Sequence, residues 1–214
     1  CVVTGDLRYR DLAWKQIEAL FNHPEWSEWQ DLAHLGRYPA DLRTGMFALD
    51  LALAYDWLYD YLTSEQRRWL VDGLDRRAIQ PFWQCVERKA SWTTGGNNWC
   101  TVIVGGIGVL GMSLAGDHPD SQRLVDFSRK RITAYLKDYG REGEFNESVG
   151  YSQSTRLPVT YFAALACSIG NGGEVLSGWP LEQAAVWSAY TYLPPGRYMS
   201  FGDGGTDSPP VMSW

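Results

Sequence analysis

The segment between residues 98 and 115 constrains the fold more than any other part of this chain of 214 residues. It is apolar on almost all sides, and a helix of that kind has to be buried among other helices. Its glycines are Gly105, Gly106, Gly108 and Gly111. Glycine is a poor helix former, but it lets neighbouring helices approach closely. We therefore expect a central helix here, enclosed by other helices.

Helical patterns separated by short polar loops fill most of the remaining sequence. They cover residues 7–21, 41–62, 63–88, 117–140, 152–169 and 181–193. The third begins with a Thr-Ser-Glu-Gln capping box at Thr63, and Pro81 is expected to kink or break it. The tail after Gly196 shows no helical period, and no segment is a convincing strand. The sequence thus predicts an all-α domain of about seven helices, whose short connections favour antiparallel neighbours.

Charge and composition exclude several classes of protein. The net charge of -6 argues against a nucleic-acid binder and against a nonspecific polyanion binder. No stretch is long enough for a transmembrane helix. The 11 Trp and 12 Tyr are expected mainly to pack helices together, while a few line a groove for sugar rings. The chain starts at Cys1 without a methionine and ends at Trp214, so we expect a fragment or a processed piece of a longer chain.

Cysteines and histidines do not form a metal-binding pattern. The cysteines are Cys1, Cys85, Cys100 and Cys167, and no two of them form a C-x-x-C motif. The three histidines are scattered, without H-E-x-x-H, so no metal site is expected. Cys100 and Cys167 lie in apolar helical runs, and we expect both to be buried.

The first segment with chemical character is residues 95–99, Gly-Gly-Asn-Asn-Trp, which leads into the apolar helix. The glycines indicate a sharp turn, and one asparagine suffices to cap the helix. A carboxamide from Asn97 or Asn98 can also donate hydrogen bonds to a substrate carboxylate, which stabilises negative charge in a water-poor cleft. The alternatives, a plain cap or a substrate contact, stay open for each residue.

The second segment is residues 143–151, a polar loop between two helical patterns. It places Glu147 and Tyr151 about one helical turn apart. Tyrosine can act as a general acid or base when its neighbours favour it, and Arg156 can supply the positive field or hold a substrate carboxylate. In the alternative interpretation, Glu147 caps the following helix and Tyr151 packs against it.

Two further aspartates carry weaker signals. Asp56 lies within a helix whose other face is apolar, so we expect it to be buried and bonded to a partner, or else to contact a substrate hydroxyl. Asp203 lies in a glycine-rich turn and is either a turn former or a residue at the edge of a cleft.

Four segments together resemble the toroid domain of heparinase II/III-like and alginate lyase families of polysaccharide lyases. They are residues 53–58 (Leu-Ala-Tyr-Asp-Trp-Leu), 97–99 (Asn-Asn-Trp), 147–151 (Glu-x-x-x-Tyr) and 201–203 (Phe-Gly-Asp), in that order along nearly the whole chain. The resemblance implies an incomplete (α/α) toroid of antiparallel helical hairpins spanning residues 1–214. It also implies a β-sandwich domain that follows in a longer chain, and a metal in that domain is left open.

These families cleave uronic-acid polysaccharides, such as glycosaminoglycans or alginate, by β-elimination. The resemblance implies that Asn98 neutralises the substrate carboxylate and that Tyr151 is the catalytic acid. Asn97, Trp99, Glu147 and Arg156 are then expected to contact the substrate. No redox cofactor is needed, the partner is an acidic polysaccharide, and the location is the bacterial periplasm or the exterior.

One departure from the family pattern concerns the general base. Well-studied members often carry histidine directly after the asparagine, where this chain has Trp99. Members also take a catalytic histidine or tyrosine from the β-sandwich domain. With no suitable histidine in the pattern of this sequence, the base is expected to be Tyr151 itself or a residue outside this chain. Two other interpretations remain open: a non-catalytic carbohydrate-binding domain, and a glycoside hydrolase that uses two carboxylates among Asp56, Glu147 and Asp203.

Overall fold

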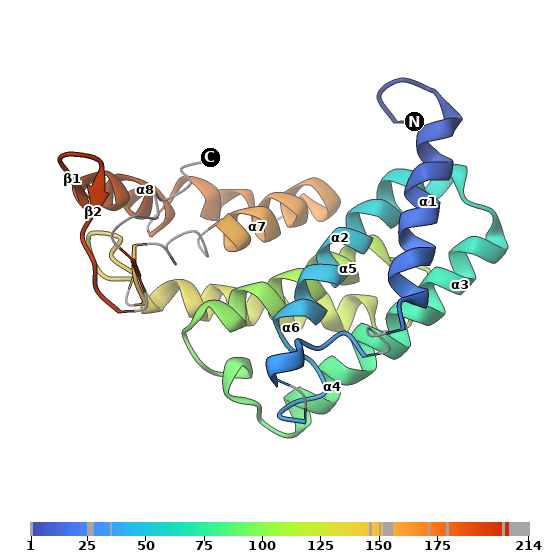
Figure 1. The fold of residues 1–214 in the computed structure, drawn as a ribbon, viewed down its shortest axis with the longest axis horizontal. Coiled ribbons are helices and arrows are strands. Elements are labelled where there is room, and N and C mark those ends of the chain that lie inside the picture. Colours follow the sequence, from blue (N-terminus) through green and yellow to red (C-terminus); the bar gives the residue numbers. More distant parts are fainter. Residues whose placement is uncertain are drawn as a thin grey trace.

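The computed structural model describes residues 2–24, 28–34, 36–145, 147–149, 151, 156–170, 172–178, 180–202 and 204–205. Within these ranges the chain is mostly helical, as predicted (Figure 1). The α-helices are α1 (Leu7–Asn22), α2 (Leu42–Leu58), α3 (Ser64–Leu74), α4 (Gln80–Glu87), α5 (Gly105–Ser113), α6 (Ser121–Tyr135), α7 (Arg156–Ile169) and α8 (Leu181–Tyr190). Short 3-10 segments lie at Leu32–His34, Tyr59–Tyr61, Ser91–Thr93, Leu136–Asp138 and Gly173–Ser177.

Two π-helical segments join neighbouring helices into longer runs. Asp75–Ile79 connects α3 to α4, and Cys100–Val104 leads into α5. The predicted capping box of α3 is present, because Thr63 and Gln66 each accept a hydrogen bond from the other's backbone N–H. Pro81 lies in the first turn of α4, and the helical run is not broken there; the π-helical segment Asp75–Ile79 directly before α4 keeps it continuous.

The helix α5 is the buried centre of the molecule, as its apolar sequence predicts. It packs against α2, α6 and α7. A Cβ atom on Gly106 would lie 2.0 Å from the carbonyl oxygen of Gly45 in α2, so only glycine allows this backbone contact. A Cβ atom on Gly108 would lie 2.4 Å from the ring of Tyr161 in α7. The glycines therefore permit close helix packing, as expected.

The helices run in two alternating directions. Helices α2, α5 and α7 begin at one end of the molecule, while α1, the α3–α4 run and α6 run back toward that end (Figure 1). In α6, Leu124 packs near Gly111 and Ile132 near Gly105, so α6 is antiparallel to α5. We call the end where α2 and α5 begin the loop end, and the opposite end, where α2 finishes at Leu58, the far end. The loops before α2, α5 and α7 all gather at the loop end.

Several details differ from the predictions. Cys100 is buried as expected, but Cys167 is exposed. Asp56 was expected to be buried, yet it is exposed; its neighbour Tyr55 is the buried residue and donates a 2.8 Å hydrogen bond to Asp117. Because α2 is apolar on most sides, its sequence does not define which of two adjacent residues faces inward.

The last helix and the tail also differ from the prediction. Helix α8 ends at Tyr190 rather than Leu193, and a short antiparallel hairpin follows, although no strand was expected. Its strands are β1 (Tyr192–Leu193) and β2 (Arg197–Tyr198), which pair in the register Tyr192 with Tyr198. No helix within the described ranges is both long and apolar enough to cross a membrane.

Candidate functional site

The turn before Asn98 is held tightly against α6. Arg131 donates a 2.9 Å hydrogen bond to the carbonyl oxygen of Gly95. A Cβ atom on Gly96 would lie 2.0 Å from a carboxylate oxygen of Asp138, so a larger residue there would require the Asp138 side chain to move. These contacts hold the turn from which Asn98 starts the buried helical run.

A hydrogen bond joins the two segments in which the sequence predicts site residues. The backbone N–H of Asn98 donates to Oε2 of Glu147 over 3.2 Å. A carboxylate is favoured at this place because the first N–H groups of a helix have no partner within the helix and carry partial positive charge. Glu147 therefore caps the helix that begins at Asn98, 49 positions earlier in the sequence.

An aromatic cluster fixes the loop that carries Glu147. Phe145 is 1% exposed, and its ring centroid lies 5.1 Å from that of Tyr139. Tyr139 in turn lies 5.8 Å from Tyr135 in α6. Gly143 has φ +83°, and a Cβ atom there would meet the backbone of α8 at 2.2 Å. The loop is therefore anchored on both sides, by α6 and by α8.

Ser148 connects this loop to the chain that follows the fourth segment of the sequence pattern, residues 201–203. It is fully buried, and its Oγ accepts a 3.1 Å hydrogen bond from the backbone N–H of Tyr151. A Cβ atom on Gly204 would lie 2.8 Å from the Cβ of Ser148, so the chain after Phe201 passes directly beside it. Tyr151 itself is 36% exposed, which leaves its side chain within reach of a ligand.

The remaining predicted site residues are placed as follows. Asn97 is exposed, whereas Asn98 and Trp99 are half-buried. Trp99 packs against His34, with ring centroids 4.8 Å apart. Arg156 begins α7, and its side chain lies outside the described part of the structure, as does Asp203. The structure thus brings Asn98, Trp99, Glu147 and Tyr151 to the loop end.

The pair His34 and Asp41 also lies at this end, and the sequence did not predict it as part of the site. His34 lies beside Trp99, and its Nδ1 is 3.3 Å from Oδ2 of Asp41. His34 and Trp99 are 65 positions apart in the chain, so no short sequence pattern predicts their contact. Asp41 is the N-cap of α2 and accepts a 2.9 Å hydrogen bond from the N–H of Arg43.

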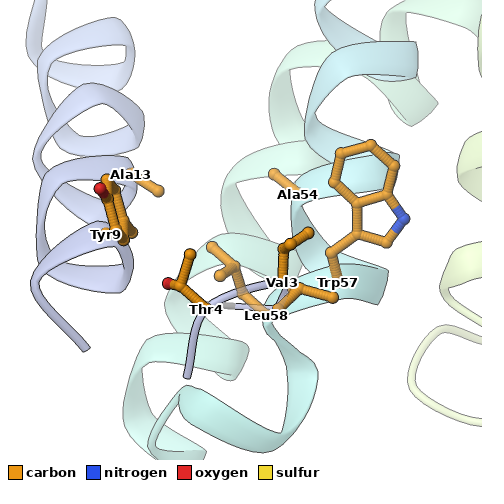
Figure 2. Close-up of a pocket in the computed structure, with 8 residues that line it drawn as sticks. Val3, Thr4, Tyr9, Ala13, Ala54, Trp57 and Leu58 are labelled. Carbon is orange, nitrogen blue, oxygen red and sulfur yellow. The ribbon is translucent and has the colours of Figure 1, made fainter. Parts of the chain in front are cut away.

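Two hollows lie at the far end, away from these residues. One has a volume of about 400 Å³ and is almost entirely apolar (Figure 2). Its lining residues are Val2, Val3, Thr4, Tyr9, Ala13, Ala54, Trp57 and Leu58. The other is more polar, with a volume of about 310 Å³, and contains Tyr55, Arg67 and Asp117. Since α2 has 17 residues, they lie on the order of 20 Å from the loop end.

Neither the search for metal-binding groups nor the comparisons with known proteins identifies a function for the loop end. No group of three or more His, Cys, Asp or Glu side chains within the described ranges is arranged to hold a metal ion. No protein-family model matches the chain, and a search of curated proteins gives no match. Neither comparison assigns the chain to a family.

Proposed function

We propose that this chain is the helical half of a polysaccharide lyase, which cleaves a uronic-acid polysaccharide by β-elimination. The observation that carries the proposal is the hydrogen bond from the N–H of Asn98 to Glu147, because it brings the segments of Asn98 and Tyr151 to one place. An acidic polysaccharide is then the partner, a periplasmic or extracellular location follows, and no redox cofactor is required.

The arrangement of the helices supports this proposal. In an incomplete (α/α) toroid, helical hairpins place alternate helices in two layers, and α2, α5 and α7 are the inner helices of that arrangement. Their N-termini share the loop end, where partial positive charge favours an anionic substrate. Glu147 takes up part of this charge, so in our proposal it mainly positions the loop of Tyr151.

The chemical roles follow from the groups at the loop end. β-Elimination removes the proton from the carbon beside the uronate carboxylate and breaks the bond to the glycosidic oxygen. The side-chain amide of Asn98 donates hydrogen bonds to that carboxylate, which stabilises the negative charge that develops as the proton leaves. The phenol of Tyr151 gives its proton to the departing oxygen.

The positions of Asp56 and Glu147 argue against these two carboxylates as the catalytic pair of a hydrolase. Asp56 lies near the end of α2, toward the far end, whereas Glu147 lies at the loop end. The two are separated by on the order of 20 Å along α2, while hydrolysis needs carboxylates within about 10 Å of each other. Asp56 and Glu147 therefore do not form a catalytic pair.

Ultraviolet absorbance tests the proposal, because elimination creates a conjugated alkene at the new chain end. The full-length protein is mixed with a panel of uronic-acid polysaccharides, and both absorbance and new reducing ends are followed. We expect absorbance to rise on at least one polymer, and Tyr151→Phe to lower the rate by roughly 10³-fold without loss of folding. Tyr190→Phe, an 80% exposed tyrosine on α8, is the matched control and should keep the wild-type rate.

Each other result contradicts the proposal in a defined way. Reducing ends without absorbance would identify a hydrolase. Glycan binding without either signal would identify a carbohydrate-binding domain. Full activity in Tyr151→Phe would remove Tyr151 from the mechanism.

A further inference from the structure

His34 lies at the loop end in a setting that ordinary packing does not require. It ends the 3-10 segment Leu32–His34, just before α2, and its side chain is 30% exposed. Its partner Asp41 is 2% exposed, so a nearly buried carboxylate is bonded to a ring that reaches the surface. Such a pairing fixes the orientation of an imidazole that stays partly exposed.

The hydrogen bonds of Asp41 determine where the imidazole carries its proton. Oδ1 accepts from the N–H of Arg43 at 2.9 Å, and Oδ2 accepts from the N–H of Asp31 at 2.6 Å. Asp41 is thus an acceptor in each of these contacts, so Nδ1 of His34, 3.3 Å from Oδ2, is the donor. The neutral imidazole then has its lone pair on Nε2.

Trp99 connects His34 to the proposed site. The rings of His34 and Trp99 lie 4.8 Å apart, and Trp99 directly follows Asn98 in the chain. Asn98 in turn contacts Glu147, whose loop carries Tyr151. The sequence offered no histidine near Asn98, but the fold supplies one from a segment more than sixty positions away.

We infer that His34 is the general base of the elimination and that Asp41 is its positioning residue; this rests on the proposed lyase function. Nε2 of His34 takes the proton from the carbon beside the uronate carboxylate. The electron pair of that C–H bond forms the new carbon–carbon double bond, and the bond to the glycosidic oxygen breaks. That oxygen receives the proton of Tyr151, and water restores both side chains.

The kinetic test compares two histidines in the same kind of pair. His34→Gln should lower kcat by roughly 10²- to 10⁴-fold with little change in KM, as expected for loss of a general base. His34→Ala should recover part of its rate when imidazole is added to the solution. His118→Gln is the matched control, because His118 lies 3.3 Å from Asp75, away from the loop end, and its rate should stay at the wild-type level.

Nuclear magnetic resonance of the histidine ring nitrogens gives a readout that needs no substrate. The wild-type protein should show the hydrogen of neutral His34 on Nδ1. In Asp41→Asn, whose amide can donate toward Nδ1, that hydrogen should move to Nε2, and kcat should fall as well. A hydrogen on Nε2 in the wild type would overturn the assignment.

The outcomes separate this inference from the lyase proposal. If the wild type forms alkene and His34→Gln does so at the same rate, the lyase stands and His34 is not its base. If the wild type forms no alkene on any polymer, both fail together. A large loss of kcat in His34→Gln, with imidazole rescue of His34→Ala, supports both.

Discussion

Two histidines of this protein lie at the same distance from an aspartate, yet their surroundings differ. His34 and Asp41 are at the loop end, and His118 and Asp75 are away from it; both pairs have an N···O distance of 3.3 Å. His118 uses both ring nitrogens, since Nδ1 accepts a hydrogen bond from the N–H of Asp120. His118 is 10% exposed, whereas His34 is 30% exposed.

The difference shows that the contact alone does not define a function. At His118 the pair ties the start of α6 to the π-helical segment between α3 and α4, and the ring has no further nitrogen to offer. At His34 the pair uses Nδ1, and the ring is 30% exposed and lies beside Trp99. We therefore expect substitutions at the loop end to change activity and substitutions elsewhere to change mainly stability.

After the substitutions of Tyr151 and His34, the next largest effect at the loop end is expected for Glu147→Ala. The change removes the acceptor for the N–H of Asn98 and loosens the loop of Tyr151. We expect kcat/KM to fall by about 10²-fold, since small misplacements of reacting groups have effects of that size. The free energy of unfolding should fall by about 1 kcal/mol, as for other lost helix caps.

Initial rates and urea unfolding measure the two effects of Glu147→Ala. Glu182→Ala, an exposed residue in the first turn of α8, is the control and should change neither. A stability loss without a rate loss would mean that Glu147 is only a cap.

The next effect concerns the close backbone contact between α5 and α2 at Gly106. Gly106→Ala should destabilise the protein by about 1–3 kcal/mol, because its Cβ would meet the backbone of Gly45 at 2.0 Å. Gly105→Ala is the control: its Cβ would find nothing nearer than Ile132 at 4.0 Å, so it should stabilise the helix by about 0.5–1 kcal/mol. Urea unfolding measures both, and equal effects would contradict the described packing of α2 on α5.

Tyr55→Phe probes the far end and should leave activity unchanged. It removes the 2.8 Å hydrogen bond to Asp117, and we expect a loss of about 1–2 kcal/mol in unfolding free energy with the wild-type kcat/KM.

Burial, and then the carboxylate of Asp117, raise the pKa of Tyr55. In the unfolded chain the phenol ionises first, so its contribution to stability is present below pH ~10 and is lost as the pH rises further.

Urea unfolding as a function of pH follows this loss. The wild type should lose more stability above pH ~10 than Tyr55→Phe does. Parallel curves for the two proteins would show that Tyr55 is not buried as described.

The smallest effect concerns the thiol beneath the loop end. Cys85 is buried beside Ala40, and burial raises the pKa of its thiol to about 11, from a usual value of 9.0. Its contribution to stability is therefore complete below pH 9.0 and is lost as the pH approaches about 11.

In the folded protein, alkylation with iodoacetamide followed by peptide mass mapping should label the exposed Cys167 well before Cys85. Equal labelling would contradict the packing under Asp41.

Much of the fold follows from local sequence signals. The buried helix with its glycines and the capping box at Thr63 depend on residues close together in the chain, and both are present. Which face of an apolar helix is buried depends on its neighbours instead. That is why Asp56 and Cys167 are exposed against expectation.

The candidate site divides in the same way. Asn98 and Tyr151 stand in recognisable segments, and the hydrogen bond from the N–H of Asn98 to Glu147 joins those two segments. His34 gives no such signal, since its contacts with Asp41 and Trp99 are set by how the loops before α2 and α5 pack together. Long-range packing of this kind leaves no periodic pattern in the sequence, so a single sequence does not predict it.

The most direct test of the central claim is the origin of the oxygen at the new chain ends. The full-length protein digests the best polymer of the panel in water enriched in heavy oxygen, and mass spectrometry examines the products. Elimination breaks the bond without adding water, so we predict an unsaturated end one water lighter than a hydrolytic end, with no label introduced by cleavage. Labelled, saturated ends would show hydrolysis and would contradict the account.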